Sequence, residues 1–282
     1  IDEFNQENIE VLTLTFVTKI EKTPEGIRLT AVNRNGVVQL SSKSLVLATG
    51  CRERTARQIF IHGTRPAGIF TAGTAQHFIN LLGQMPTKKC VILGSGDIGL
   101  IMARRMTLEG ARVKMVLELM PYSGGLKRNI VQCLDDFAIP LYLSHTVTKL
   151  HGKHRLEGVS VAAVDGKGVP KPETEYYVPC DTLLLSVGLI PENELSRGMG
   201  VVLDPATGGP SVDAHLQTNL PGVFACGNAV QVHDLVDFVS EEATRAGVSA
   251  AQYALSGAFE EAQYKTIAGC GVRYVVPQRI AA

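Results

Sequence analysis

The feature that most constrains the fold is the stretch Lys89–Gly99, in which an apolar run ends in the pattern G-x-G-x-x-G. An amphipathic segment, residues 100–108, follows at once, and a second apolar run, Val113–Leu117, ends at the acidic Glu118. This order predicts a strand, a tight turn, a helix and a second strand with a carboxylate at its end. Dinucleotide-binding units have these parts in this order, so we expect such a site here.

The residues expected to contact the nucleotide are those of the glycine turn and the acidic residue. The turn consists of Gly94, Ser95, Gly96, Asp97, Ile98 and Gly99. Gly94 allows the tight turn, Gly96 lets the backbone approach a pyrophosphate, and Gly99 lets the helix pack close to the strand. Glu118 lies about 20–25 residues past the first glycine, where a carboxylate accepts from a ribose 2′-OH. Because it would repel a 2′-phosphate, we expect NAD(H) to be preferred over NADP(H).

Length and charge exclude several classes of protein. With 282 residues, the chain has the length of about two domains. Its 27 basic and 27 acidic residues balance, and no basic patch is visible, so no nucleic acid is expected as a partner. The apolar runs are much shorter than the roughly 20 residues of a membrane span, and no signal peptide is visible. We expect a cytoplasmic protein.

The cysteines show no local pairing. They are Cys51, Cys90, Cys133, Cys180, Cys226 and Cys270, and no two have C-x-x-C spacing. Neither a redox disulfide nor a zinc site is indicated locally, and no metal site is expected. Buried reduced thiols are the better interpretation.

The parts outside the nucleotide-binding pattern read mostly as strands. Glu10–Ile20, Gly26–Asn33 and Val37–Leu40 alternate apolar and polar residues and predict a three-stranded meander. An apolar strand follows and ends on Ala48-Thr49-Gly50. A second short buried strand lies within Thr218–Asn228 and stops at Gly227.

Other segments complete the predicted order of elements. Residues 52–73 read as a polar crossing between domains, and Thr74–Leu82 as a helix with Thr74 as its N-cap. A second meander is predicted at Thr146–His151, Val159–Val164 and Tyr176–Val178. An apolar strand is predicted at Cys180–Val187 and a later helix at Val236–Leu255. Short strands are also predicted at Ser211–Asp213 and Val272–Val276.

This arrangement resembles the pyridine nucleotide–disulfide oxidoreductase superfamily, in which an NAD(P) domain is inserted into an FAD domain. Leu45–Gly50 is similar to the family's A-T-G segment beside FAD, and Thr182–Pro191 to the strand and V-G turn, with Gly188, that closes the NAD domain. Thr218–Asn228 resembles the late FAD motif T-x-x-x-x-V-[FY]-A-x-G-D. In the family the last aspartate bonds the ribityl chain, and here Asn228 takes its place.

The resemblance implies an α/β fold with two Rossmann-like FAD- and NAD(P)-binding domains carrying β-meander insertions. The expected domains are residues 1–73 and 193–282 for FAD and residues 74–192 for NAD(P). It further implies FAD contacts at Ala48, Thr49, Gly50, Gly227 and Asn228, and an NAD contact at Gly188. An amide at Asn228 can still bond a hydroxyl.

Two departures from the family affect the interpretation. The first FAD fingerprint, which precedes the meander in the family, is absent from this sequence. We therefore expect either a fragment or a protein whose FAD comes with another chain, and weak FAD binding by the chain as given. The thioredoxin-reductase subgroup carries a cysteine pair inside its NAD domain, and this sequence has none there. Disulfide reduction by that route is not expected.

The function implied by the resemblance is passage of hydride between NAD(H) and flavin N5, with no side-chain acid or base assigned. Two alternatives stay open: a non-catalytic electron-transfer or assembly subunit of a multi-chain dehydrogenase, and an NAD-binding redox sensor. Expected partners are a small-molecule substrate or a partner dehydrogenase subunit, in a homo- or hetero-oligomer. The sequence is most similar to NAD-linked flavoprotein subunits found with amino-acid, opine or glycerol-phosphate oxidising partners.

Several residues after the late FAD motif have two interpretations each. His233 and Asp234 are candidates for contact with flavin or substrate, although a packing role for His233 is favoured. Cys51, after the A-T-G segment, could approach flavin or be a packed thiol. Glu241–Glu242 could bind a cationic substrate, but negative charge in the first turns of a helix is the ordinary role.

Overall fold

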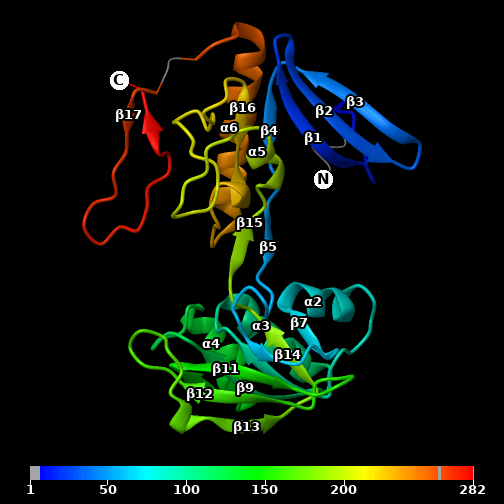
Figure 1. Ribbon diagram of the computed structural model, residues 1–282, viewed down its shortest axis with the longest axis vertical. Coiled ribbons are helices and arrows are strands. Elements are labelled where there is room, and N and C mark those ends of the chain that lie inside the picture. The colour runs from blue at the N-terminus through cyan, green and yellow to red at the C-terminus, as the bar shows by residue number, and fades with distance from the viewer. Residues whose placement is uncertain (1–6, 260–261, 282) are drawn as a thin grey trace. The chain divides into compact units, whose positions relative to one another are not determined.

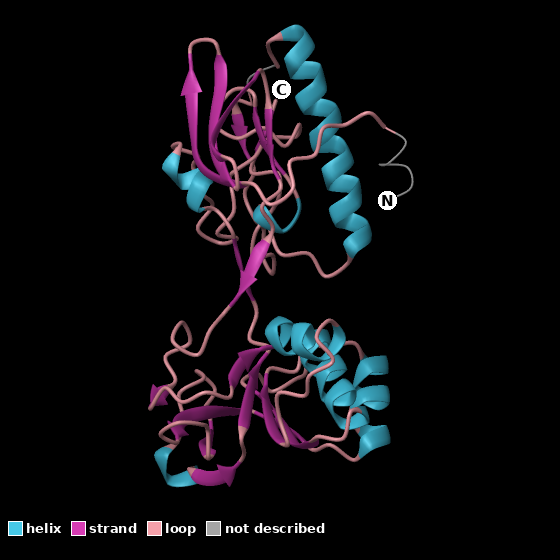
Figure 2. Cartoon of the chain, turned by 90° about the vertical axis from the view of Figure 1, so that its right-hand side faces the viewer, coloured by secondary structure: helices cyan, strands magenta, loops and turns pink. Residues whose placement is uncertain are grey.

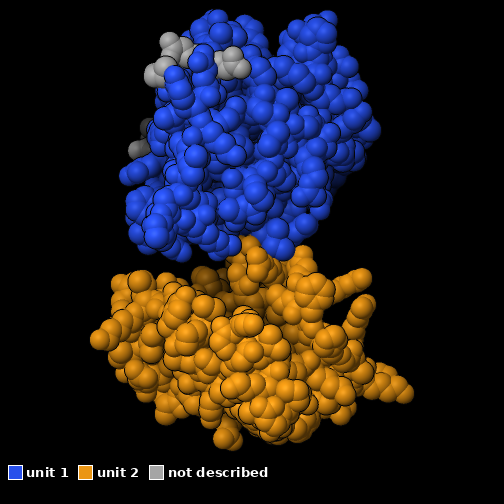
Figure 3. Space-filling model, turned by 60° about the vertical axis from the view of Figure 1, so that its left-hand side comes forward, with its two compact units in different colours: residues 1–52, 190–282 blue, residues 53–189 orange. Residues whose placement is uncertain are grey.

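The chain folds into two compact units. A computed structural model describes residues 7–259 and 262–281. One unit consists of Ile1–Arg52 and Ile190–Ala282, and the other of the continuous segment Glu53–Leu189 (Figure 3). The second unit is thus inserted into the first along the chain. We call them the outer unit and the inserted unit.

The inserted unit is built on a five-stranded parallel sheet (Figure 1). The strands in spatial order are β10 (Leu141–Leu143), β9 (Arg112–Glu118), β8 (Lys89–Leu93), β14 (Thr182–Leu185) and β7 (Ile69–Thr71). Every neighbouring pair is parallel. Parallel sheets are covered on both faces, which explains why the four residues of β14 are all buried.

Helices cover one face of this sheet and a second sheet covers the other (Figure 2). The helices are α2 (Ala72–Asn80), α3 (Asp97–Leu108) and α4 (Lys127–Cys133). The second sheet has the order β13 (Tyr176–Pro179), β12 (Gly158–Ala163), β11 (His145–His151), β6 (His62–Gly63). Ile92 lies in the core on the helix side, and its neighbour Leu93 in the core on the other side, as the two-residue period of a strand requires.

The outer unit contains an antiparallel meander, a parallel strand pair and a long helix. The meander is β1 (Phe16–Thr23), β2 (Gly26–Asn33) and β3 (Gly36–Ser42). The parallel pair is β4 (Leu45–Leu47) with β16 (Val223–Ala225), and the helix is α6 (Val236–Ser256). Their apolar side chains form one core that includes Ile27, Leu47 and Val223.

The remaining elements are short. Strands β5 (Cys51–Glu53) and β15 (Leu189–Pro191) form a two-stranded sheet. The helix α5 (Glu194–Gly198) and the pair β17 (Tyr264–Lys265) and β18 (Arg279–Ile280) belong to the outer unit. Short 3-10 turns cover residues 135–137, 172–174 and 227–229. Among the described residues, no helix is both long and apolar enough to cross a bilayer.

The predicted helix Val236–Leu255 is confirmed almost to the residue. Buried positions Glu242, Ala246, Ser249 and Ala250 follow the helical period, which gives α6 one core-facing side. It ends where Gly257 takes a left-handed conformation (φ 80°).

Three predictions about the first part of the chain are wrong. The first strand begins at Phe16 rather than Glu10, because the chain turns through a left-handed residue at Leu14 (φ 52°). The stretch predicted as a crossing contains strand β7, which is too short to show a pattern. Helix α2 begins at Ala72, so Thr71 and not Thr74 is the N-cap residue.

Two predicted strands in the outer unit are also wrong. Residues 211–213 form no strand; the Val212 N–H bonds the side-chain oxygen of Gln278 at 3.0 Å. The segment Val272–Val276 is irregular. Helix α5 was not predicted, since five residues are too few to show a helical period.

Candidate functional site

The carboxyl ends of three parallel strands in the inserted unit meet at one cavity of about 700 Å³. Gly94 follows β8, Glu118 ends β9, and Ser186 follows β14, and all three line it. Ligands of open α/β sheets bind outside the carboxyl ends of the strands. The position of this cavity is therefore the one expected for a dinucleotide.

The three glycines of the turn differ in what an added side chain would meet. Gly94 has φ 103°, and a Cβ there would overlap the Ser186 carbonyl. A Cβ on Gly99 would overlap the carbonyl oxygen of Gly94. Gly96 has φ −65°, and a Cβ there would meet nothing within 4 Å. Packing therefore explains Gly94 and Gly99, while the space beside Gly96 is open to a ligand.

Glu118 is held by the turn it faces. Its Oε2 accepts from the Ser95 N–H at 2.9 Å and from the Ser95 hydroxyl at 2.7 Å. Its Oε1 accepts from the Met120 N–H at 3.0 Å. A carboxylate has about four acceptor positions, so these bonds leave room for about one more donor. Sequence reasoning found Glu118 but not its role in fixing the glycine turn.

Asp97 anchors the start of α3. Its Oδ1 accepts from the Leu126 N–H at 2.8 Å and from the Asn129 side-chain amide at 2.7 Å. Ile98, the next residue, is 51% exposed. The first N–H groups of a helix lack intrahelical acceptors, and Gly96 is the N-cap residue of α3, with no side-chain cap hydrogen bond.

Much of the cavity wall was not predicted. It includes Arg54 and the segment Ile59–His62, then Thr146 and Ala162 of the second sheet, and Pro170 and Pro172 from the loop before β13. These residues come from segments far apart in the sequence, and no local pattern marks them. Ser186 and Val187 line the cavity next to the predicted Gly188 (φ 90°), whose carbonyl accepts from the Arg54 N–H at 3.1 Å.

A second pair of strand ends lies in the outer unit. Strands β4 and β16 are parallel, so their carboxyl ends meet at one edge. Buried Leu47 is followed by exposed Ala48 and Thr49 and by Gly50 with φ 70°. Buried Ala225 is followed by Cys226 and by Gly227 with φ 64°. The two predicted FAD segments thus lie at the same sheet edge.

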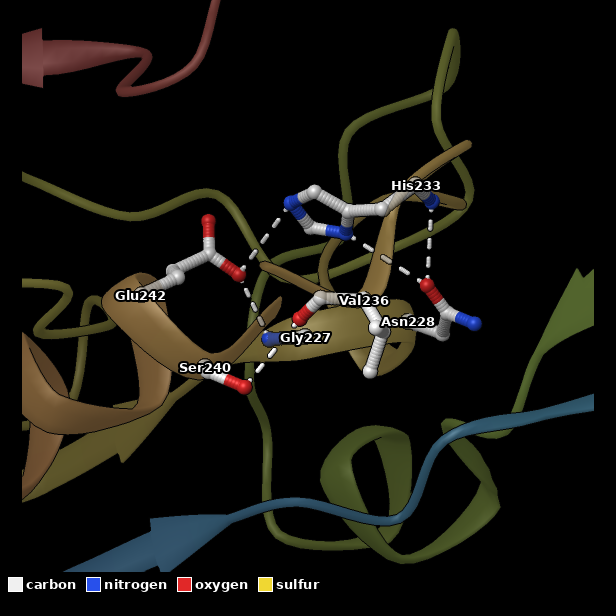
Figure 4. Close-up of polar contacts among 6 residues, drawn as sticks. All are labelled: Gly227, Asn228, His233, Val236, Ser240 and Glu242. Atoms are coloured by element: carbon white, nitrogen blue, oxygen red, sulfur yellow. Dashed lines mark hydrogen bonds and ion pairs between the residues drawn. The ribbon is translucent and has the colours of Figure 1, made fainter. Parts of the chain in front are cut away.

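Asn228 links these two strand ends. Its Nδ2 lies 3.6 Å from the Cys51 sulfur. Its Oδ1 accepts from the His233 N–H at 3.0 Å, as Figure 4 shows. The Nδ1 of His233 is 3.4 Å from the same oxygen. His233 Nε2 lies 3.7 Å from Glu242 Oε2, which also accepts from the Gly227 N–H at 2.5 Å.

The residues with two interpretations can now be placed. His233 packs in the turn with its side chain 9% exposed. Asp234 and Glu241 are exposed, whereas Glu242 is buried and bonded to the turn. Glu242 therefore does not serve as negative charge at the start of its own helix, because its partner is the backbone N–H of Gly227.

The cysteines are mostly buried, as predicted, although Cys51 is half-buried and Cys270 exposed. Burial and the charge of Asp181 raise the pKa of Cys180 to about 11. Burial, with Glu242 nearby, also raises the pKa of Cys226. Both thiols are therefore protonated at neutral pH and suited to packing rather than to nucleophilic chemistry.

Comparison with known proteins identifies the family. The model of the family described as "Pyridine nucleotide-disulphide oxidoreductase" matches residues 1–257. The chain belongs to this family. Members bind FAD and NAD(P)H and are oxidoreductases, so the resemblance read from the sequence is confirmed.

Curated relatives match over most of this chain. The chain is 26% identical over 253 residues to the NADH oxidase of Methanocaldococcus jannaschii, covering 86% of this chain and 51% of that protein. It is 22% identical over 205 residues to one of the opine oxidase subunits of Agrobacterium tumefaciens, covering 68% of this chain and 40% of the relative. The chain thus spans about half or less of the length of these relatives.

Solved structures of the family share the fold. The T. acidophilum thioredoxin reductase matches with a TM-score of 0.68 at 22% identity, covering 86% of this chain and 74% of that one. The bacillithiol disulfide reductase of Bacillus cereus matches with a TM-score of 0.69 at 18% identity, covering 91% and 75%. The α/β fold with two nucleotide-binding domains is confirmed by this likeness.

The residues present fit both cofactors of the family. In the inserted unit, the open space beside Gly96 is where a backbone must leave room for a pyrophosphate. In the outer unit, a Cβ on Gly50 would also meet nothing within 4 Å, beside the exposed Ala48 and Thr49. Asn228 presents an amide donor at the same edge.

Proposed function

We propose that this protein is an FAD-dependent oxidoreductase linked to NAD(H), which passes hydride between NAD(H) and flavin N5. The observation that carries the proposal is the open space beside Gly96, at a turn whose other two glycines are fixed by packing. The bound cofactors supply the hydride chemistry. The chain supplies binding, orientation and a water-excluding wall, and no side-chain acid or base is assigned.

The nucleotide site is proposed to prefer NAD(H) over NADP(H). The turn Gly94–Gly99 and the start of α3 would hold the pyrophosphate, with Gly188 near the end of β14. Glu118 would accept from the ribose 2′-OH through its remaining acceptor position. Arg54 is the only lysine or arginine among the described residues lining the cavity, so little positive charge is present to bind a 2′-phosphate.

The outer unit is proposed to bind FAD at the ends of β4 and β16, through Ala48, Thr49, Gly50, Gly227 and Asn228.

The domain division proposed from the sequence assigns residues 74–192 to NAD(P) and residues 1–73 and 193–282 to FAD. The compact units have their borders at other residues, Arg52/Glu53 and Leu189/Ile190. Helix α6 has 21 residues and starts after the Gly227 turn. Its positive N-terminal end would favour an anionic flavin.

A second function has one observation in its favour. Asn228 stands where the family carries aspartate, which suits a subunit whose flavin chemistry belongs to a partner chain. Relatives named as a subunit of opine oxidase and as the ferredoxin reductase component of a dioxygenase are parts of multi-component systems. We propose a partner dehydrogenase subunit for this protein too, and flavin reduction by NADH separates the two functions.

The test is NADH binding by the Gly96→Ala variant, measured by calorimetry. Because the new Cβ enters open space at an ordinary φ, folding should be unchanged, while the approach of the pyrophosphate is blocked. We expect affinity for NADH to fall at least about ten-fold, or roughly 1.4 kcal/mol. Gly198→Ala, also in open space but in α5 of the outer unit, is the control. Equal NADH affinity in both variants would contradict the proposed site.

A further inference from the structure

The orientation of the Asn228 amide is fixed by a backbone donor. The His233 N–H can only donate, and it lies 3.0 Å from the atom assigned as Asn228 Oδ1. That atom is therefore the oxygen, and Nδ2 is the atom directed to the Cys51 sulfur at 3.6 Å. Asn228 thus presents N–H groups, not an acceptor, at the end of the A-T-G strand.

The His233 ring then lies between two acceptors (Figure 4). Its Nδ1 is 3.4 Å from Asn228 Oδ1, and its Nε2 is 3.7 Å from Glu242 Oε2. A neutral imidazole has one N–H and one lone pair, so one of the two contacts would set a lone pair against an acceptor oxygen. With Glu242 ionised, both contacts are favourable when both ring nitrogens carry a proton.

An ionised Glu242 would be stabilised by a nearby cation, because its side chain is buried. Its side chain is 10% exposed, and burying an unpaired carboxylate is costly. Among the described residues, His233 is the only basic side chain within 4 Å of it. The neighbouring carboxylates Asp234, Asp237 and Glu241 are exposed, and the Cys226 thiol beside Glu242 is neutral because its pKa is raised. Nothing else in the described part of this turn supplies a positive charge to Glu242.

We propose that Glu242 holds His233 as an imidazolium, and that this cation is a positioning residue that fixes the Asn228 amide. The late FAD motif of this chain would then present an amide donor with a positive charge behind it, where the family motif presents a carboxylate. A consequence that rests on the FAD site proposed above is that this charge favours the reduced, anionic flavin over the neutral oxidised form.

The first test needs no flavin. We would record the ring ¹⁵N resonances of His233 in the full chain at pH 7.5, where an ordinary histidine is mostly neutral. We expect two similar resonances, as in an imidazolium, and the separated pair of a neutral ring in Glu242→Gln. That variant keeps an acceptor for the Gly227 N–H, so the turn should stay folded. Glu241→Gln removes the same charge from an exposed position and should leave the spectrum unchanged.

A neutral ring in the parent protein, or an imidazolium that persists in Glu242→Gln, would overturn the proposal. The second test measures the midpoint potential of flavin added to the parent protein and to His233→Gln. Loss of the cation should shift the potential to a more negative value, with Glu241→Gln as the unshifted control. An unshifted potential in His233→Gln would overturn the consequence for flavin. Failure of any variant to bind flavin would count against the proposed FAD site and leave the result of the first test standing.

Discussion

Among single residues, the glycine turn shows what a motif can and cannot predict. The spacing of Gly94, Gly96 and Gly99 predicted a tight turn, and the structure places it at the end of β8. The distinction between glycines needed for packing and the one beside open space depends on Ser186, which follows β14, about 90 residues later. No local pattern contains that information.

Glu118 is a similar case. Its place at the end of the second strand was predictable from the order of elements, and the structure confirms that place. Its three bonds to Ser95 and Met120 were not, because they depend on how the turn and the strand end fold against each other. The network at Asn228, His233 and Glu242 was missed for the same reason, although His233 was a candidate.

The charge of Glu118 is expected to favour NADH over NADPH. Glu118→Gln keeps an acceptor for the Ser95 hydroxyl but removes the charge that would repel a 2′-phosphate. We expect the affinity ratio NADH/NADPH to fall about ten-fold, or roughly 1.4 kcal/mol, in binding titrations. Glu109→Gln, which removes a charge from the residue that caps the other end of α3, is the matched control and should keep the parent ratio. A parent protein that binds both nucleotides equally would contradict the role given to Glu118.

At the scale of elements, prediction succeeded where a pattern was long enough. Helix α6 and strands β8, β9, β11 and β12 follow their hydrophobic periods and lie where the sequence placed them, within a few residues. Strand β7 and helix α5 have only three and five residues, too few for a period. Their structure is imposed by neighbours, since β7 exists because it pairs with β14.

Asp181 ties two strands together at the amino end of the parallel sheet. Its carboxylate accepts from the Thr87 hydroxyl at 2.9 Å and from the N–H groups of Lys88 and Lys89, just before and at the start of β8. Burial alone would raise the pKa of Asp181, but these hydrogen bonds outweigh it and hold the pKa below its usual value. Asp181 therefore stabilises the fold at pH values above the ordinary aspartate pKa of about 3.9. This contribution is lost as the pH falls through the lower pKa that Asp181 has in the folded protein.

Loss of the Asp181 charge should destabilise the protein at neutral pH more than in acid. Asp181→Asn should lower the free energy of unfolding at pH 7 by about 1 kcal/mol, a modest value because solvent reaches part of the carboxylate. The difference from the parent protein should shrink as pH falls below about 4. Denaturant unfolding at several pH values measures this difference in the free energy of unfolding. The control is Asp136→Asn, at an exposed position. NADH affinity should be unchanged, because Asp181 lies at the opposite end of β14 from the cavity. A difference in unfolding free energy that grows in acid would contradict the role given to Asp181.

At the scale of the whole molecule, the order of motifs along the chain predicted the architecture. One nucleotide-binding segment lies between two pieces that each end a buried strand on glycine, and the structure shows an inserted unit within an outer unit. The family match over residues 1–257 agrees with that order. The cavity walls of the inserted unit could not be predicted, because they combine segments that approach each other only in the folded chain.

The proposed transfer of hydride from NADH to flavin is what separates an oxidoreductase from the alternative functions. It is tested most directly by adding FAD to the purified protein, removing unbound flavin, and recording the visible spectrum before and after NADH is added without oxygen. We expect the absorption of protein-bound oxidised flavin to disappear with NADH, and to do so far more slowly in Gly96→Ala. Flavin that stays bound and oxidised while NADH binds would contradict the proposed oxidoreductase and favour the electron-transfer or assembly subunit.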